Sequence, residues 1–144
     1  MLLAAATLSV PGCQQGIRWQ ALTYPDAQTR SRAVNKPIFV YFFEWASVDC
    51  THFDQEVLSK PEVLTETDSL VCVPLLAHYD VALMTQFGLD KIPAFAIVAP
   101  AGELLARGQG TITLSGLLDA IRGAKAKFAS GAGSATAPPP AKPP

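Results

Sequence analysis

Three cysteines are the residues of this chain with the clearest capacity for chemistry. Cys13, Cys50 and Cys72 are too few for a disulfide scaffold, and their spacing does not fit a structural zinc site. An odd number leaves at least one thiol for another task, such as attachment to a lipid, burial in a core or redox chemistry.

The two histidines invite a metal-site interpretation together with Cys50. His52 lies two residues after Cys50 and so points to another side of a helix, whereas His78 lies much further along the chain. This geometry is poor for shared ligation, so the sequence predicts no metal site and no cofactor. We expect His52 to be a partly exposed helix residue and His78 to lie in a loop after a strand.

The elements that must position these residues alternate between strand and helix from residue 17 to residue 128. An unbroken apolar run at 38–43 predicts a central strand that is covered on both faces. Apolar residues at helical spacing predict a helix from about Cys50 to Lys60, and Ser115 is expected to cap the last helix. The other predicted helices are 26–34, 82–87 and 116–128, and the other strands are 70–76, 92–98 and 104–107. The expected fold class is α/β, a mixed central sheet with helices on both faces.

The order of these features resembles the thioredoxin superfamily over about residues 19–128. The resemblance rests on the strand at 38–43, on Trp45 and Cys50 around the start of the next helix, on the run from Cys50 to Pro61-Glu62-Val63, and on Ile92-Pro93. It implies a thioredoxin-like fold in which Pro93 is the cis-proline and residues 100–103 form the turn of the last hairpin.

The same resemblance implies a degenerate active-site motif. Redox-active members carry Cys-x-x-Cys at the start of this helix, where the helix dipole lowers the pKa of the first thiol and makes it the attacking nucleophile. Cys50 corresponds to the second cysteine, and the motif reads Ser47-Val48-Asp49-Cys50. Serine cannot replace a thiolate in disulfide exchange, so the ordinary dithiol cycle is absent. Tyr41 also stands where many thioredoxins bury an acidic residue.

Three interpretations of Cys50 are open at this stage. It is a partly buried thiol on a helix capped by Ser47, or the catalytic residue of a single-cysteine redox site, or the disulfide partner of Cys72. Asp49 opposes a thiolate beside it, and Cys72 is expected to face the core because free cysteine is among the most buried residue types. We favour the first interpretation.

The leading functional hypothesis is an accessory module without dithiol catalysis that either binds a peptide or protein or is associated with redox chemistry. Its groove would pair the backbone beside the cis-proline with an extended chain. The alternative is an atypical thiol-disulfide oxidoreductase that acts through Cys50 alone, with a second thiol from a partner or from glutathione. A third hypothesis is a structural domain whose tail is the interacting element. The residues expected to line the groove are Trp45, Ser47, Val48, Asp49, Ile92 and Pro93.

The two ends of the sequence differ from the middle. In residues 1–16, an apolar run precedes Val10-Pro11-Gly12-Cys13, which resembles the lipobox of a bacterial signal peptide and implies lipidation of Cys13. The run is too short to cross a bilayer as a helix. The expected location is the bacterial cell envelope, with a lipid-anchored or secreted chain. Residues 129–144 carry many prolines and no large apolar side chain, which predicts a disordered tail.

Charge and composition exclude several classes of protein. Eleven Lys and Arg against twelve Asp and Glu give a net charge of −1, without blocks of like charge, so the sequence does not predict nucleic-acid binding or a polybasic membrane patch. The content of 49% hydrophobic residues is ample for a packed core. The length of 144 residues fits one domain, predicted at 17–128.

Overall fold

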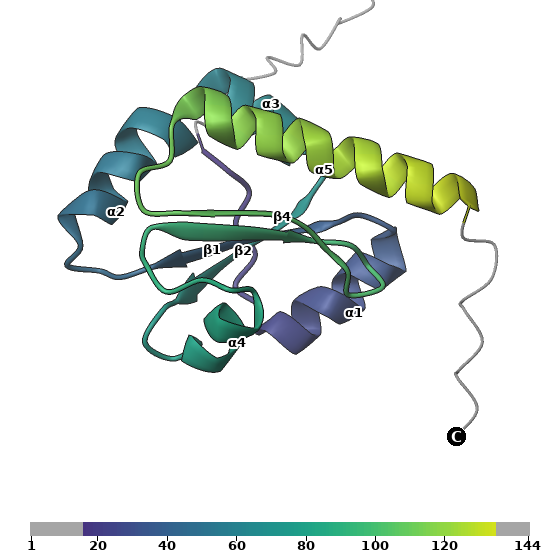
Figure 1. Ribbon diagram of the computed structural model, residues 1–144, viewed down its shortest axis with the longest axis horizontal. Coiled ribbons are helices and arrows are strands. Elements are labelled where there is room, and N and C mark those ends of the chain that lie inside the picture. The colour runs from purple at the N-terminus through teal and green to yellow at the C-terminus, as the bar shows by residue number, and fades with distance from the viewer. Residues whose placement is uncertain (1–15, 135–144) are drawn as a thin grey trace, which may run out of the picture.

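The computed structural model describes the backbone of residues 16–134 (Figure 1). The candidate lipidation site Cys13 and residues 135–144 of the predicted tail lie outside the described residues. The elements, in chain order, are α1 (Tyr24–Val34), β1 (Ile38–Phe43), α2 (Val48–Phe53), the π-helical turn η1 (Asp54–Leu58), α3 (Pro61–Thr67), β2 (Val71–Leu76), α4 (Val81–Gln86), β3 (Ala94–Val98), β4 (Leu104–Gln109) and α5 (Leu114–Ser134).

The four strands form one mixed sheet in the order β2-β1-β3-β4. Strand β1 runs parallel to β2 and antiparallel to β3, and β3 runs antiparallel to β4. Ile38 therefore pairs with Val71 on one side and with Val98 on the other. The predicted mixed sheet, with the run at 38–43 as a central strand, is confirmed.

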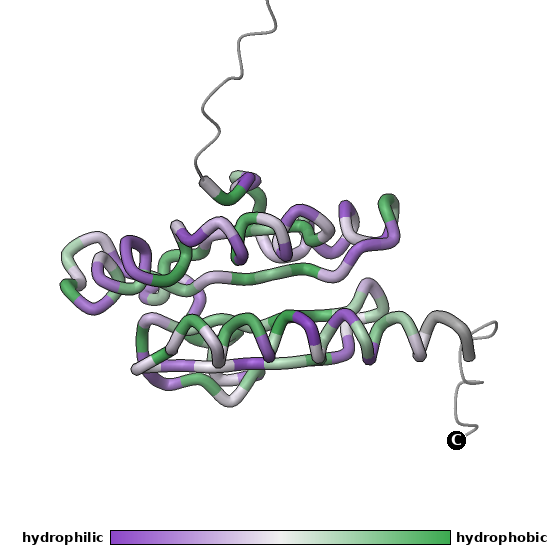
Figure 2. Tube along the Cα trace, turned by 90° about the horizontal axis from the view of Figure 1, so that it is seen from above, coloured by the Kyte–Doolittle hydropathy of each residue, from purple (hydrophilic) through white to green (hydrophobic). Residues whose placement is uncertain are grey.

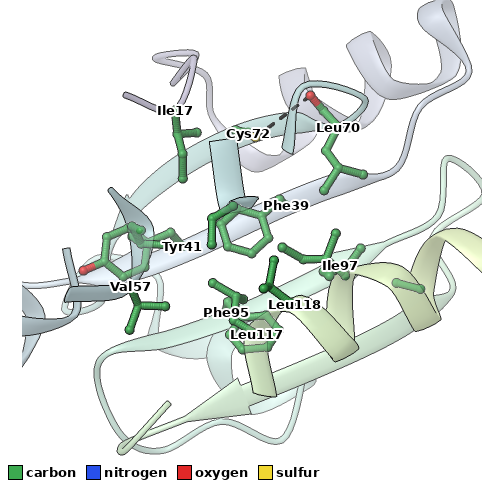
Figure 3. Close-up of a cluster of buried hydrophobic side chains, with 14 of the residues drawn as sticks. Ile17, Phe39, Tyr41, Val57, Leu70, Cys72, Phe95, Ile97, Leu117 and Leu118 are labelled. Carbon is green, nitrogen blue, oxygen red and sulfur yellow. Dashed lines mark hydrogen bonds between the residues drawn. The ribbon is translucent and has the colours of Figure 1, made fainter. Parts of the chain in front are cut away.

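Helices cover both faces of this sheet because β1 is apolar on both. Ile38, Val40 and Phe42 pack on the side of α1 and α4, in one cluster with Ala27 and Met84. Phe39 and Tyr41 point to the other side, where α2, η1, α3 and α5 contribute to a second cluster (Figures 1 and 3). Along α5, hydrophobic and hydrophilic residues alternate with the turns of the helix (Figure 2), as expected for a helix with one face on the core.

The segment after Cys50 differs from its prediction. The helix does reach Leu58 through α2 and η1, but Pro61 then begins a separate helix, α3, which is not among the predicted helices. Proline suits the first position of a helix because its missing N–H has no partner there and its fixed φ is already helical. No helix among the described residues is long and apolar enough to cross a membrane.

Both ends of the last helix also differ from their predictions. Thr113, rather than Ser115, caps α5, because the backbone N–H of Gly116 donates to Thr113 Oγ1 at 3.1 Å. The helix continues to Ser134, so the predicted tail is wrong for residues 129–134. No proline occurs between Leu114 and Pro138 to stop the helix. The carbonyl oxygen of Ala126 still accepts a hydrogen bond from Ser130 Oγ at 3.2 Å.

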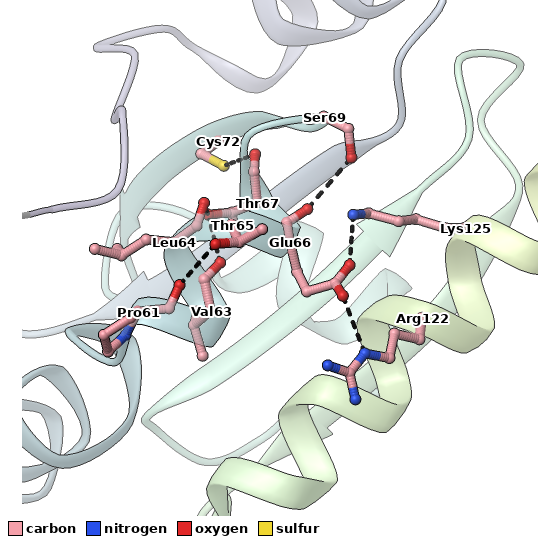
Figure 4. A network of polar contacts seen from close by, with 10 residues as sticks. All are labelled: Pro61, Val63, Leu64, Thr65, Glu66, Thr67, Ser69, Cys72, Arg122 and Lys125. Atoms are coloured by element: carbon pink, nitrogen blue, oxygen red, sulfur yellow. Dashed lines mark hydrogen bonds and ion pairs between the residues drawn. The ribbon is translucent and has the colours of Figure 1, made fainter.

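Helices α3 and α5 are joined by ion pairs at the surface. Lys125 Nζ lies 2.7 Å from Glu66 Oε2, and Arg122 Nε lies 3.0 Å from Glu66 Oε1 (Figure 4). The hydrogen bonds from Lys125 and then Arg122 lower the pKa of the Glu66 carboxyl. The pairs therefore favour the folded state only while this carboxyl is ionised.

Glu66→Gln is expected to lower the free energy of unfolding at pH 7 by up to about 1 kcal/mol, the range of exposed ion pairs. Because the folded pKa lies below the unfolded one of about 4.3, this stability is present above that value and is lost as the pH falls through the folded pKa. Urea unfolding at pH 7 and pH 3 measures it. The matched change Glu62→Gln, at an exposed residue of the same helix, should have no such pH-dependent effect.

Candidate functional site

The candidate site begins with the cap of helix α2. Ser47 has extended backbone angles, φ −84° and ψ 117°, and its Oγ accepts a hydrogen bond from the backbone N–H of Cys50 at 3.2 Å. Thr51 Oγ1 donates to the carbonyl of Ser47 at 3.1 Å. The predicted capping role of Ser47 is confirmed, and the cap fixes the position of Cys50 in the first turn.

Ser47→Ala is expected to cost about 1 kcal/mol of folding stability, because the N–H of Cys50 loses its acceptor. Ser47→Asp keeps an oxygen acceptor at the same place and adds a favourable charge near the helix N-terminus, so its stability should stay near that of the natural chain. Denaturant unfolding of the three proteins measures the difference. Equal stability of the alanine and aspartate variants would contradict the capping role.

Cys50 and Cys72 are both buried free thiols. Their exposed fractions are 2% and 1%, and no disulfide joins them, which excludes the pairing that the sequence left open. Cys72 Sγ lies 3.6 Å from the carbonyl oxygen of Thr67. Burial, with a contribution from Asp68, raises the pKa of Cys72 to about 12, so this thiol stays protonated near neutral pH. The structure places Cys72 in the core, as predicted.

A phenol and a carboxylate lie near Cys50. Tyr41, which stands where many thioredoxins bury an acidic residue, is 3% exposed. Its hydroxyl has no hydrogen-bond partner among the described residues. Burial, followed by the nearby Asp54 carboxylate and Cys50 thiol, raises the pKa of Tyr41. Partial burial also raises the pKa of the Asp54 carboxyl, although the residue as a whole is exposed. The sequence did not single out Asp54 as a site residue, although it follows Cys50 by one helical turn.

Three of the predicted groove residues do meet in one depression, which we call the helix–loop groove. Asp49 contributes from α2, and Ile92 and Pro93 contribute from the loop before β3, where the Ile92–Pro93 peptide bond is cis. His52 and Thr111 also line this groove, whose volume is about 560 Å³. Pro93 is buried and Ile92 is half-buried, while Asp49 is exposed at its edge.

The other three predicted groove residues lie elsewhere. Trp45, Ser47 and Val48 line a separate, shallower hollow of about 310 Å³. Trp45 and Val48 are 79% and 80% exposed, so neither is held in the core. The six residues that the sequence placed in one groove are thus divided between two neighbouring depressions, because the turns of α2 direct Val48 and Asp49 to different sides. His52 lines both depressions.

The two histidines lie on different elements, His52 in α2 and His78 in the turn after β2. His52 is exposed on α2, as predicted. His78 follows β2, and its Nδ1 lies 2.7 Å from Glu44 Oε1, which also accepts its backbone N–H at 2.7 Å. These hydrogen bonds lower the pKa of Glu44. The pair ties the loop after β1 to the loop after β2, and the described residues contain no group of three His, Cys, Asp or Glu side chains able to hold a metal ion.

A third depression, which we call the aromatic hollow, was not predicted from the sequence. Its walls include Trp19, Tyr41, Phe43 and Trp45, with Asp54 at one side, and its volume is about 410 Å³. The ring centroids of Trp19 and Tyr41 are 5.7 Å apart, and those of Phe43 and Trp45 are 5.1 Å apart. Alternation along β1 puts Tyr41 and Phe43 on the same side of the strand. Trp19 reaches them through a bridge to β2 that only the folded chain reveals.

Comparison with known structures identifies the fold. No protein-family model and no curated protein sequence matches the chain. Among solved structures, a thioredoxin from Thermus thermophilus is 24% identical, with a TM-score of 0.69 over 85% of this chain and 98% of that one. A putative disulphide-isomerase from Bacteroides thetaiotaomicron is 21% identical, with a TM-score of 0.66 over 77% of this chain and 94% of that one.

A third similar structure is described as the oxidoreductase DsbH. It is 17% identical, and the alignment has a TM-score of 0.60 over 83% of this chain and 95% of that one. The names of these proteins describe redox chemistry in the proteins themselves, and identities this low establish the architecture only. This chain has the thioredoxin-like fold, with Ser47 capping and Cys50 buried in the helix that follows its first strand.

Proposed function

We propose that this chain is a thioredoxin-like accessory module of the cell envelope that binds a peptide or protein segment and does not perform dithiol exchange. The observation that carries the proposal is the role of Ser47: a hydroxyl caps the helix three residues before Cys50, where a redox-active member of this fold carries its attacking thiol. An uncharged hydroxyl has no sulfur redox chemistry, and the one thiol of the motif is 2% exposed.

The helix–loop groove supports a binding role. It combines apolar walls from Phe53, Ile92 and Pro93 with polar groups at Asp49 and Lys91, and its volume falls in the range of ligand-binding depressions. An extended segment laid in it would contact α2 and the loop before β3 together. The envelope location is supported by the lipobox-like sequence that ends at Cys13.

A competing function is redox chemistry through Cys50 alone. Its position in the first turn of α2 favours it, because the helix N-terminus stabilises a thiolate. It requires an incoming disulfide to reach a sulfur that the structure buries. The two functions therefore differ in whether Cys50 reacts in the folded protein.

The deciding experiment compares thiol reaction and peptide binding in the folded chain. An aromatic disulfide reagent should modify Cys50 much more slowly before denaturation than after it, and reduction of a model disulfide substrate should stay at the level of the uncatalysed reaction. Turnover that Cys50→Ser abolishes would overturn the proposal and establish the single-cysteine function.

For the binding arm, a displayed library of random peptides is selected on the natural protein. Selected peptides should lose affinity for Thr111→Arg, which places a long side chain in the groove from an exposed position. They should keep their affinity for the matched Thr29→Arg, which is exposed on α1 and lies outside the groove. Equal binding by both variants would show that the groove is not the binding surface.

A further inference from the structure

The aromatic hollow combines features that the helix–loop groove lacks. Four aromatic side chains line it, and the exposed fractions of its two tryptophans, Trp19 and Trp45, are 37% and 79%. Large aromatic surfaces that remain open to solvent mark interaction sites more often than they serve stability. The hollow and the helix–loop groove share no lining residue, so the two surfaces can be tested separately.

The only charged side chain among the described lining residues of this hollow is Asp54. No ion pair within residues 16–131 involves Asp54, and partial burial raises the pKa of its carboxyl more than the neighbouring Tyr41 hydroxyl lowers it. A cation placed in the hollow would supply the missing partner. The faces of the surrounding rings are also negative, so rings and carboxylate favour the same sign of ligand charge.

Tyr41 adds a directional requirement. Tyr41 lines the hollow, and only 3% of its surface is exposed. Its hydroxyl oxygen has no hydrogen-bond partner among the described residues. In Figure 3 this hydroxyl points away from the other labelled side chains of the core cluster. A buried oxygen without a partner is costly, and a ligand that donates an N–H to it would remove that cost.

We propose that the aromatic hollow binds the cationic side chain of a lysine or arginine from a partner protein. The aliphatic stem would pack against Trp19 and Trp45, while the ammonium or guanidinium group would lie near Asp54 and donate a hydrogen bond to Tyr41 Oη. Both side chains combine an apolar stem with a charged head that carries N–H donors, which matches the walls and the polar end of the hollow. A protein-borne side chain fits because Trp45 leaves the hollow open at the surface.

Both tryptophans of the chain line the hollow, so intrinsic tryptophan fluorescence reports on it directly. The probe is a capped pentapeptide with one lysine between alanines, titrated into the full chain. Two comparison peptides carry norleucine, which keeps the stem without the charge, or Nε-trimethyllysine, which keeps the charge without an N–H donor. The lysine peptide should give a saturable change, and both comparison peptides should bind more weakly.

Single substitutions test whether the lysine peptide binds in the aromatic hollow. Asp54→Asn is expected to weaken binding of the lysine peptide about tenfold or more, whereas Asp119→Asn, an equal charge change at an exposed position of α5, should leave it unchanged. Tyr41→Phe removes an oxygen without a partner, so it should fold well and weaken the lysine peptide more than the trimethyllysine peptide. It also serves as the decisive variant if Asp54→Asn does not fold.

Four results would overturn the inference. They are the absence of a saturable fluorescence change, equal binding of the norleucine peptide, equal binding of the trimethyllysine peptide, and an equal loss of affinity in Asp119→Asn. Failure here leaves the proposed function intact, because that proposal depends on Thr111 and the helix–loop groove.

Discussion

Ser47→Cys is expected to give this chain a reversible disulfide with Cys50. The introduced thiol would stand at the N-cap of α2, where the helix N-terminus lowers the pKa of a thiol, and Cys50 follows in the first turn. Oxidised glutathione would supply the oxidant: two protein thiols lose two electrons and two protons, and one glutathione disulfide becomes two thiols. The variant should lose about two titratable thiols per chain on oxidation.

The new disulfide should also change stability and activity. Closing so small a loop should make the oxidised form more stable than the reduced form by about 2 kcal/mol. With dithiothreitol as the electron donor, reduction of a model disulfide substrate should rise from the uncatalysed level to measurable turnover. The double variant Ser47→Cys with Cys50→Ser is the control and should lose both effects. If the single variant keeps all its thiols under oxidised glutathione, the assigned relation between positions 47 and 50 is wrong.

Phe39→Ala is expected to lower the free energy of unfolding by about 3–5 kcal/mol, the largest loss we predict for any single residue. Phe39 has no exposed surface, and its ring centroid lies 5.8 Å from that of Phe95 and 6.2 Å from that of Trp19. Truncation removes apolar contacts and leaves a cavity between the sheet and α5. This is a large part of the roughly 5–15 kcal/mol that stabilises a typical domain.

Two companion variants separate cavity formation from general damage. Phe39→Leu keeps most of the apolar volume and should cost about 1–2 kcal/mol. Tyr79→Ala also removes an aromatic ring, but this residue is 78% exposed, so its effect should stay within about 0.5 kcal/mol. Chemical denaturation gives the free energies. An effect of Phe39→Ala no larger than that of Tyr79→Ala would contradict the assigned core.

The main strands were predictable because their signals are local. The run at 38–43 is apolar at consecutive positions and rich in β-formers, which is typical of a strand buried on both faces, and β1 lies inside the sheet between β2 and β3. Gly88, which follows the short helix α4, has φ +70°, a conformation that glycine tolerates. The boundaries at Pro61 and Thr113 were missed because proline both stops and starts helices, and because serine is on average the stronger capping residue although Thr113 caps this helix.

The candidate site was predictable only in part. The sequence by itself determined the residues of the motif, Ser47 to Cys50, and the order of elements that places a capped helix after the first strand. Tertiary structure decided which of those residues share a surface. Asp49 joins Ile92 and Pro93 in one groove, whereas Trp45 turns to another.

The aromatic hollow illustrates the same division. Nothing in the local sequence links Trp19 to Tyr41 or Asp54, because their proximity depends on a bridge from the N-terminal segment to β2 and on the packing of α2 and η1 in the core cluster that contains Tyr41. Side-chain periodicity fixes which face of an element a residue occupies. The packing of distant elements sets which other faces meet it, and that packing brings the Tyr41 hydroxyl close to the Asp54 carboxylate.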